Sequence, residues 1–97
     1  MSRPTRFKFR LYIAGDTQNS IQAVANLSAL CEGHIPNHHF EIDVVDVLRE
    51  PRRALADGIF MTPTLVKLAP SPVQKIVGTL RESGRIMDVL GLRTQVA

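Results

Sequence analysis

The chain has 97 residues, 44% of them hydrophobic and 22% charged, which is the composition of one soluble globular domain. The formal net charge of +3 permits a nucleic-acid partner, but four Phe, one Tyr and no Trp leave few side chains for stacking on bases, so we expect no nucleic-acid function. The sequence contains no run of about 18 apolar residues, which excludes a membrane-spanning helix.

One cysteine, Cys31, is present, so the chain carries no Cys-x-x-Cys pair for dithiol exchange. Residues 1–6 lead into an alternating segment rather than an uninterrupted apolar one, which argues against a secretory signal. A single free thiol without a signal favours a cytoplasmic location. We expect one domain over residues 1–97, with flexible ends at 1–6 and 93–97.

The first half of the chain has clear hydrophobic periods. From Phe7 to Ile13 every second residue is apolar, which predicts a half-buried strand. Asp16 or Thr17 is placed to cap the next element, an amphipathic helix predicted from Gln18 to Glu32, and Gly33 is placed to end it. The apolar residues of this helix recur at spacings of three or four and are Ile21, Val24, Leu27, Leu30 and Cys31.

A second strand is predicted from Phe40 to Val47, and its almost wholly apolar end indicates a more deeply buried strand. Pro51 fits the first turn of a short helix that continues to Ile59. Thr62-Pro63-Thr64 follows, directly before an apolar run that predicts a third strand. Thioredoxin-type folds place a proline that is often cis at this point, and a cis X-Pro bond marks a fixed turn.

A turn is predicted at residues 69–72, and a fourth strand at residues 73–77, ending at Gly78. A final helix is predicted at residues 82–92. The predicted order is β-α-β-α-β-β-α, an α/β thioredoxin-like fold. The second half also permits another packing, because the apolar residues of 73–80 stand three and four apart and suit a helix as well as a strand. A chain with two near-equal packings of one half is able to switch between them.

Several separated segments resemble the KaiB family of small circadian clock proteins. The first strand and helix start are matched by Leu11–Thr17 with Asn19-Ser20, and the second strand and next helix entry by Val45–Leu48 with Pro51. The proline-rich second half is matched by Thr62–Leu65, Lys67, Pro70, Pro72-Val73, Lys75-Ile76 and Gly78. The resemblance runs from about Phe9 to Leu92, nearly the whole chain.

The resemblance implies a protein without enzymatic activity or cofactor that binds the hexameric ATPase KaiC and takes part in its phosphorylation cycle, in a clock or in a stress or timing system. It also implies a metamorphic chain. The resting form is a dimer or tetramer with the alternative order β-α-β-β-α-α-β, and the partner-binding form is a thioredoxin-like monomer. KaiA-like or histidine-kinase clock proteins are further candidate partners.

On this basis we expect partner contacts at the end of the second strand and on the second helix, at Asp46, Leu48, Arg49, Arg53, Ala54 and Asp57. Turn and fold-switch positions are expected at Pro63, Pro70, Pro72, Gly78, Val89 and Gly91. The chain departs from the family pattern at Gln18, Gln22, Gly58, Val89 and Gly91. The basic residues of the middle and second half form either a solvated face or a surface for an acidic partner; they are Arg49, Arg52, Arg53, Lys67 and Lys75.

Other reactive residue types have simpler interpretations. Cys31 lies on the apolar side of its helix and is expected to be a buried structural thiol. His34, His38 and His39 occupy a connector without metal-ligand spacing, so we expect no metal. Two alternative functions stay open. One is a thioredoxin-like sensor or adaptor that docks on another signalling protein. The other is a thioredoxin-like oxidoreductase or transferase using Cys31 or a glutathione-type ligand, although the C-terminal end of a helix disfavours an activated thiolate.

Overall fold

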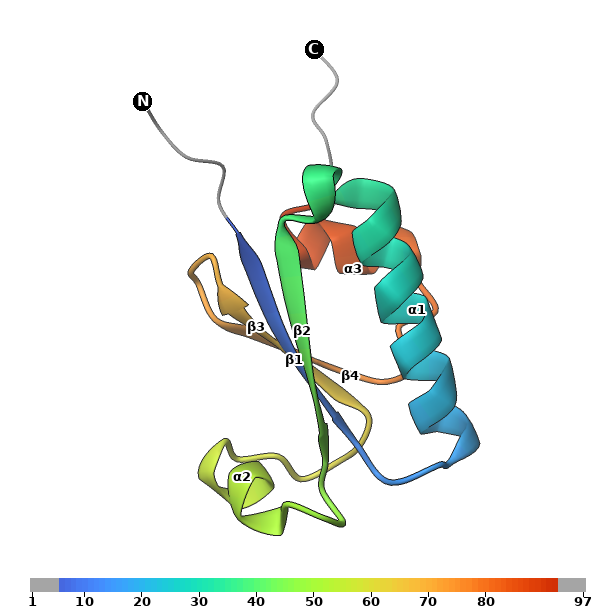
Figure 1. The fold of residues 1–97 in the computed structure, drawn as a ribbon, viewed down its shortest axis with the longest axis vertical. Coiled ribbons are helices and arrows are strands. Elements are labelled where there is room, and N and C mark those ends of the chain that lie inside the picture. The colour runs from blue at the N-terminus through green and yellow to red at the C-terminus, as the bar shows by residue number, and fades with distance from the viewer. Residues whose placement is uncertain (1–5, 93–97) are drawn as a thin grey trace.

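The computed structural model describes residues 6–92 of the chain, drawn in Figure 1. Its elements, in chain order, are β1 (Phe7–Ile13), α1 (Gln18–His34), the 3₁₀ turn η1 (Pro36–His38), β2 (Phe40–Asp46), α2 (Pro51–Ala56), β3 (Thr64–Ala69), β4 (Gln74–Val77) and α3 (Ser83–Leu90). The predicted order β-α-β-α-β-β-α is confirmed. Of the flexible ends predicted at 1–6 and 93–97, all but Arg6 lie outside the described residues.

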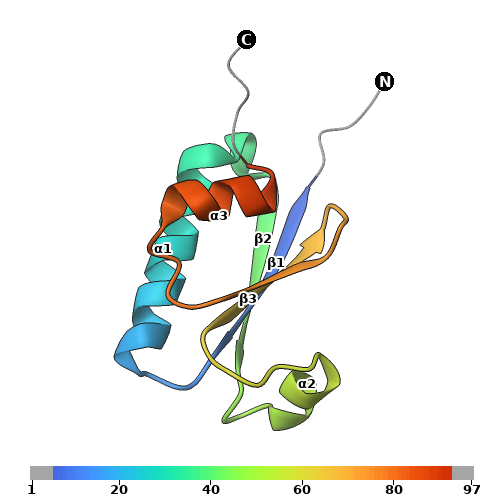
Figure 2. The same ribbon diagram turned by 180° about the vertical axis from the view of Figure 1, so that it is seen from behind.

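The four strands form one mixed sheet in the order β2-β1-β3-β4. β1 runs parallel to β2 and antiparallel to β3, and β3 runs antiparallel to β4. Helices α1 and α3 cover one face of this sheet, and α2 lies against the other face (Figures 1 and 2). Within residues 6–92 no helix is long and apolar enough to cross a membrane.

The central strand β1 contributes buried side chains to both faces of the sheet, Phe9 and Leu11 to one and Tyr12 to the other. The larger core cluster joins the sheet to α1 and α3 and contains Phe9, Leu11, Ala23, Leu27, Leu30, Cys31, Ile35, Leu65, Leu80, Ile86, Leu90 and Leu92. The smaller cluster joins the opposite face to α2 and contains Tyr12, Val45, Ala54, Ile59 and Val66. Each buried large side chain contributes about 1.5–3 kcal/mol, so α2 is held by much less apolar burial than α1.

Helix α1 begins as the sequence predicts and ends later. The hydroxyl oxygen of Thr17 accepts the backbone N–H of Ser20, which confirms Thr17 as the N-cap. Gly33 is wrong as the C-terminal stop, because the helix continues through His34 and Ile35 closes it with a bond from its N–H to the Cys31 carbonyl. Burial of Ile35 in the larger cluster gives the physical reason, since it draws the last turn onto the core.

Strand β2 is an edge strand, which corrects the expectation of a deeply buried one. Among the described residues it pairs with β1 alone. Val45 is fully buried, whereas the adjacent Val44 is 43% exposed. A run of β-branched residues at an edge still forms a strand, since the ladder to β1 and one covered face are sufficient.

Helix α2 is shorter than predicted. Pro51 occupies its first turn as expected, but the helix ends at Ala56, and Gly58 turns the chain in the left-handed region at φ 67°. Ile59 is therefore not helical; its N–H bonds back to the Ala54 carbonyl. The Thr62-Pro63 peptide before β3 is cis, as the sequence pattern indicates, and the peptides before Pro70 and Pro72 are also cis.

Within residues 73–80, whose spacing suits a helix as well as a strand, the chain forms a strand. Residues Gln74–Val77 pair with β3, and Ile76 packs against the larger cluster. α3 follows and ends at Gly91, which takes a left-handed conformation at φ 72°. The structure is thus the thioredoxin-like arrangement and not the alternative order β-α-β-β-α-α-β.

Candidate docking surface around helix α2

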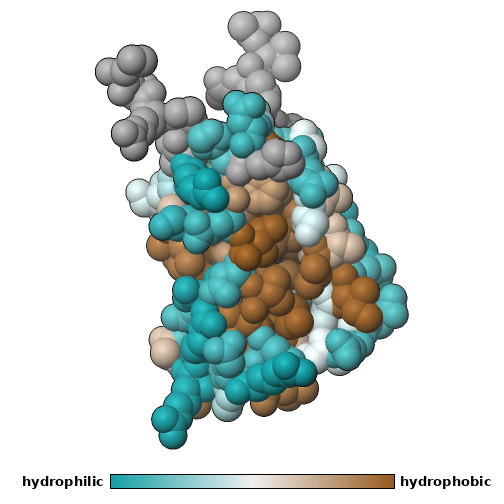
Figure 3. Space-filling view, in the orientation of Figure 1, coloured by the Kyte–Doolittle hydropathy of each residue, from teal (hydrophilic) through white to brown (hydrophobic). Residues whose placement is uncertain are grey.

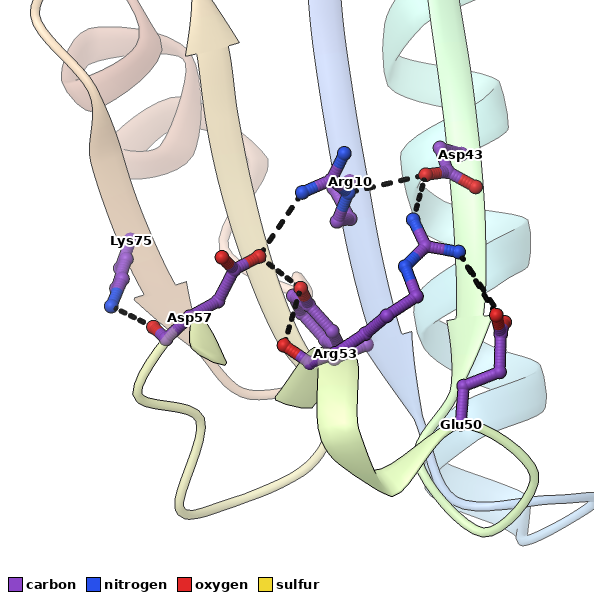
Figure 4. A network of polar contacts seen from close by, with 7 residues as sticks. Arg10, Asp43, Glu50, Arg53, Asp57 and Lys75 are labelled. Atoms are coloured by element: carbon purple, nitrogen blue, oxygen red, sulfur yellow. Dashed lines mark hydrogen bonds and ion pairs between the residues drawn. The ribbon is translucent and has the colours of Figure 1, made fainter. Parts of the chain in front are cut away.

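A network of charged side chains fixes α2 to the sheet (Figure 4). Arg10 of β1 lies between two carboxylates, with Nε 3.1 Å from Asp43 Oδ2 and Nη1 3.1 Å from Asp57 Oδ2. Arg53 of α2 donates to the same Asp43 oxygen over 2.6 Å, and its Nη1 also lies 3.3 Å from Glu50. The network therefore links the central strand, the edge strand and both ends of α2.

The Asp57 carboxylate also accepts a hydrogen bond from the buried Tyr12 hydroxyl. Lys75 of β4 donates its Nζ to the Asp57 carbonyl over 2.6 Å, so the end of α2 is held from two strands. Burial raises the pKa of Tyr12, and the bond to Asp57 raises it further. Tyr12 therefore keeps its proton at neutral pH and donates it to the carboxylate.

The two carboxylates of the network are more acidic than free aspartates. Burial alone would raise the pKa of Asp43, but hydrogen bonds from Arg53 and Arg10 outweigh it and the pKa is lowered. The bond from Tyr12 lowers the pKa of Asp57 against the opposing effect of burial, with Arg10 adding to the lowering. Both groups therefore remain ionised at neutral pH.

Of the six predicted contact residues, two reach into solvent and four are engaged within the molecule. Leu48 and Arg49 reach into solvent, Leu48 being 72% exposed. Asp46 instead accepts the backbone N–H groups of Gly15 and Leu48 and so fixes the loop between β2 and α2. Ala54 belongs to the smaller core cluster, only 7% exposed. Arg53 and Asp57 belong to the charged network described above.

Sequence reasoning missed three large apolar side chains at this end of the fold. Leu55 is 73%, Phe60 90% and Met61 58% exposed. Leu55 lies on the outer side of α2, and Phe60 and Met61 lie in the loop before β3. The signal available in the sequence was Gly58, where the chain leaves the helix and places Phe60 and Met61 in a loop. We call Leu48, Leu55, Phe60 and Met61 the α2 rim.

A second apolar area lies on another side of the molecule. Figure 3 shows apolar residues gathered between β2 and α1. Ile21 of α1 is 54% exposed and Val44 of β2 is 43% exposed, and the exposure of Ile21 corrects the predicted inward face of α1. The inward face runs instead through Ser20, Ala23, Leu27, Leu30 and Cys31.

The predicted fold-switch positions all lie in β3, β4, α3 and their connections, and their switching role stays a prediction. Gly78 and Gly91 have positive φ, and Val89 is partly exposed on α3.

The basic residues differ in their exposure. Lys67 of β3 is only 4% exposed, so the interpretation as part of a solvated face is wrong for this residue. Lys75 and Arg53 are engaged in the network, whereas Arg49 and Arg52 are exposed.

Cys31 is fully buried on α1, which confirms the expectation of a structural thiol. Burial raises the pKa of Cys31 to about 12, and the nearby Glu32 charge adds to the effect. A thiol with this pKa is almost wholly protonated at neutral pH and does not act as a nucleophile. In the part of the chain that the structure describes, no group of three His, Cys, Asp or Glu residues is arranged to hold a metal ion.

The mixed four-stranded sheet with a cis-proline before β3 and helices on both faces is a thioredoxin-like fold. The N-terminal domain of Synechococcus elongatus SasA is similar at a TM-score of 0.76 and 16% identity, covering 100% of this chain and 94% of that domain. Thioredoxin from Fasciola hepatica is similar at a TM-score of 0.70 and 18% identity, covering 91% of this chain and 82% of that protein. At these identities the similarity establishes the fold.

Sequence comparison identifies the family within this fold. The KaiB domain model matches residues 10–92, and the chain belongs to the KaiB family. It is 37% identical over 87 residues to the circadian clock protein KaiB3 of Synechocystis sp., which covers 90% of this chain and 82% of that protein. It is 38% identical over 92 residues to the circadian clock oscillator protein KaiB of Prochlorococcus marinus, covering 95% of this chain and 76% of that protein. The predicted family and the thioredoxin-like fold are thus confirmed.

Proposed function

We propose that this chain is a non-enzymatic clock-type protein that docks on a KaiC-type hexameric ATPase and modulates its phosphorylation cycle in a circadian, timing or stress system. Membership of the KaiB family supports the class of partner. The observation that carries the proposal is the α2 rim, where large apolar side chains stand in solvent beside a rigid charged network. The high pKa of the lone thiol supports a binding role over an oxidoreductase.

The α2 rim has the composition expected of the centre of a protein interface. Exposed aromatic and aliphatic side chains supply most binding free energy when a partner covers them, and surrounding charges set specificity and encounter rate. Phe60 is the strongest candidate anchor because it is 90% exposed in this fold. Arg49 borders the α2 rim with a side chain 87% exposed, and it is placed to meet an acidic group of the partner.

The mechanism is a shift of population between two folds. A partner that binds the thioredoxin-like monomer more tightly than the resting dimer or tetramer draws the chain into the bound form. The shift is limited by the difference between the two affinities, and a rarely populated competent form lowers the apparent affinity. Slow conversion would delay binding, which is the property a timing device needs.

The test is size-exclusion chromatography of the chain alone and with an ATP-loaded KaiC-type hexamer, combined with ¹⁵N NMR spectra of the same samples. We expect co-elution with the hexamer and broadening of the amide signals of Leu48, Leu55 and Phe60 on addition of the hexamer. Absence of co-elution with every KaiC-type ATPase offered would reject the proposal. Capture of a different signalling protein through the α2 rim would favour the sensor or adaptor alternative.

A further inference from the structure

Strand β4 leaves a second free edge on the sheet, distinct in residues from the α2 rim. The sheet order places β4 at one edge and β2 at the other, and in residues 6–92 no strand pairs with the outer side of either. An edge strand with free backbone groups is a template onto which an extended segment of another molecule adds.

The register shows which backbone groups of β4 face outward. The Gly78 N–H donates to the Pro63 carbonyl over 2.9 Å, so Gly78 and Pro63 form a hydrogen-bonded position at the end of the β3–β4 ladder. Bonded and non-bonded pairs alternate along an antiparallel ladder. Ile76 therefore bonds to β3, and the N–H and C=O of Lys75 and Val77 point away from the sheet.

A groove of about 480 Å³ lies beside these outward groups, between β4 and α3. Its apolar lining comes from both elements and from the segment that joins them, with Ile76, Val77, Leu80, Ile86 and Val89. Asn26 of α1 donates to the Thr79 carbonyl over 2.6 Å and so fixes the joining segment. Val77 is 56% exposed, which leaves an apolar side chain available at the open edge.

The charged residues of the groove are mostly basic, with Lys75, Arg81 and Arg85 against Glu82. Arg81 bonds to the neutral amide of Gln22, its Nη2 lying 2.8 Å from Oε1, so its charge is not compensated there. Arg85 lies 3.7 Å from Glu82 in a pair exposed to solvent. The Lys75 ammonium instead bonds to the Asp57 carbonyl at the end of α2, so the surplus positive charge of the groove comes from Arg81 and Arg85.

The β2 edge differs from the β4 edge in charge, because the acidic side chains of β2 are already paired with donors of the same chain. Glu41 lies 3.4 Å from Arg6, and Asp43 contacts two arginines of the network. Asp46 is engaged by two backbone N–H groups. A second copy of the chain is a poorer match for the basic groove than an acidic segment, because the chain itself carries a formal net charge of +3.

We propose that the β4 groove binds an extended acidic segment of another protein as a fifth strand of the sheet. The outward groups of Lys75 and Val77 form its backbone hydrogen bonds. Apolar side chains on one face of the segment pack on Val77, and the carboxylates that alternate with them face α3 and meet Arg81 and Arg85. The binding is independent of the α2 rim, so the chain holds two partner surfaces at once.

The probe is a fluorescein-labelled ten-residue peptide in which valine alternates with glutamate, compared with the same peptide carrying lysine. We expect fluorescence anisotropy to show at least tenfold tighter binding of the acidic peptide, and NMR to show slower hydrogen exchange at the Lys75 and Val77 amides. Equal affinity for both peptides, or exchange protection at Val44 on β2 instead, would overturn the proposal. The measurement contains no ATPase, so its outcome is independent of the proposed function.

Two variants and one matched control sharpen the test. Arg85→Glu should weaken binding of the acidic peptide about tenfold, whereas Arg52→Glu makes the same charge change on α2 and should leave affinity within twofold. Val77→Pro removes an outward N–H without touching the ladder to β3 and should abolish binding. If circular dichroism shows that Val77→Pro fails to fold, Arg85→Glu decides the question. Concentration-dependent dimers of the unmodified chain that compete with the peptide would assign the edge to a second copy and reject the proposal.

Discussion

Arg10 on the central strand and Asp57 at the end of α2 form an ion pair with 3.1 Å between Nη1 and Oδ2. The Asp57 carboxylate also accepts the hydroxyl proton of Tyr12, which lies two residues further along β1. One carboxylate thus receives two donors from the central strand, and it fixes the C-terminal end of the helix that carries part of the α2 rim. Because apolar burial under α2 is small, the orientation of the α2 rim depends on this group.

Replacing Asp57 by Asn should loosen α2 while leaving the larger core intact. The change removes a charge-assisted bond to Arg10 and leaves the buried Tyr12 hydroxyl with a weaker acceptor. We expect the free energy of unfolding to fall by about 1–3 kcal/mol, measured by urea denaturation. Glu82→Gln, at a side chain 74% exposed, is the control and should change it by less than about 0.5 kcal/mol. An unchanged midpoint for Asp57→Asn would show that the network does not stabilise the fold.

The same network predicts loss of stability in acid. The folded-state pKa values of Asp43 and Asp57 are lowered below the unfolded values, so the unfolded chain takes up protons more readily. Their contribution is present above about pH 4, the ordinary aspartate pKa, and is lost as the pH falls through the folded values. Urea midpoints measured from pH 7 to pH 2 should therefore fall in this window. An Asp43→Asn and Asp57→Asn double variant should show a smaller fall, and an equal fall would assign the acid sensitivity to other groups.

The sequence was sufficient where one period ran uninterrupted and tertiary contacts agreed with it. The alternation of Phe7–Ile13 predicted the strand and the burial of Phe9 and Leu11 on one face, whereas the burial of Tyr12 on the other face, against α2, did not follow from the pattern. The α2 rim was not predictable in the same way, since hydrophobicity normally indicates burial and Phe60 is exposed. The charged network was also missed, because Arg10 meets partners that stand 33 and 47 positions away in the chain.

The Cys31 thiol should be inert in the folded chain. Its pKa is raised to about 12 by burial, so the thiolate is scarce and shielded at pH 8. We expect no reaction with a disulfide reagent at pH 8 without denaturant and complete reaction in enough urea to unfold the chain. Because the folded pKa lies above the unfolded one, this thiol's contribution to stability is present below about pH 9 and lost as the pH rises toward 12. Rapid labelling of the native chain would contradict its burial.

The α2 rim should carry the binding to the KaiC-type hexamer. Phe60→Asp places a charge where we propose an apolar anchor, at a side chain that makes no contribution to either core cluster. We expect the dissociation constant to rise at least thirtyfold by calorimetry, equivalent to about 2 kcal/mol. Val73→Asp adds the same charge at an exposed apolar residue before β4 and should leave the constant within twofold. Equal effects of the two variants would place the interface elsewhere.

Two glycines provide opposite tests of the helix ends. Gly33 lies inside α1 with no atom within 4 Å of the position that a methyl group would take. Gly33→Ala should therefore raise the free energy of unfolding by about 0.5–1 kcal/mol through helix propensity.

Gly91 caps α3 in the left-handed region, at φ 72°, where a side chain costs about 1–2 kcal/mol. Gly91→Ala should therefore lower stability of the thioredoxin-like form by that amount, and because α3 belongs to the half expected to refold, it should also weaken hexamer binding. If Gly91→Ala is as stable as the parent chain and binds equally well, this cap does not control the balance between the folds.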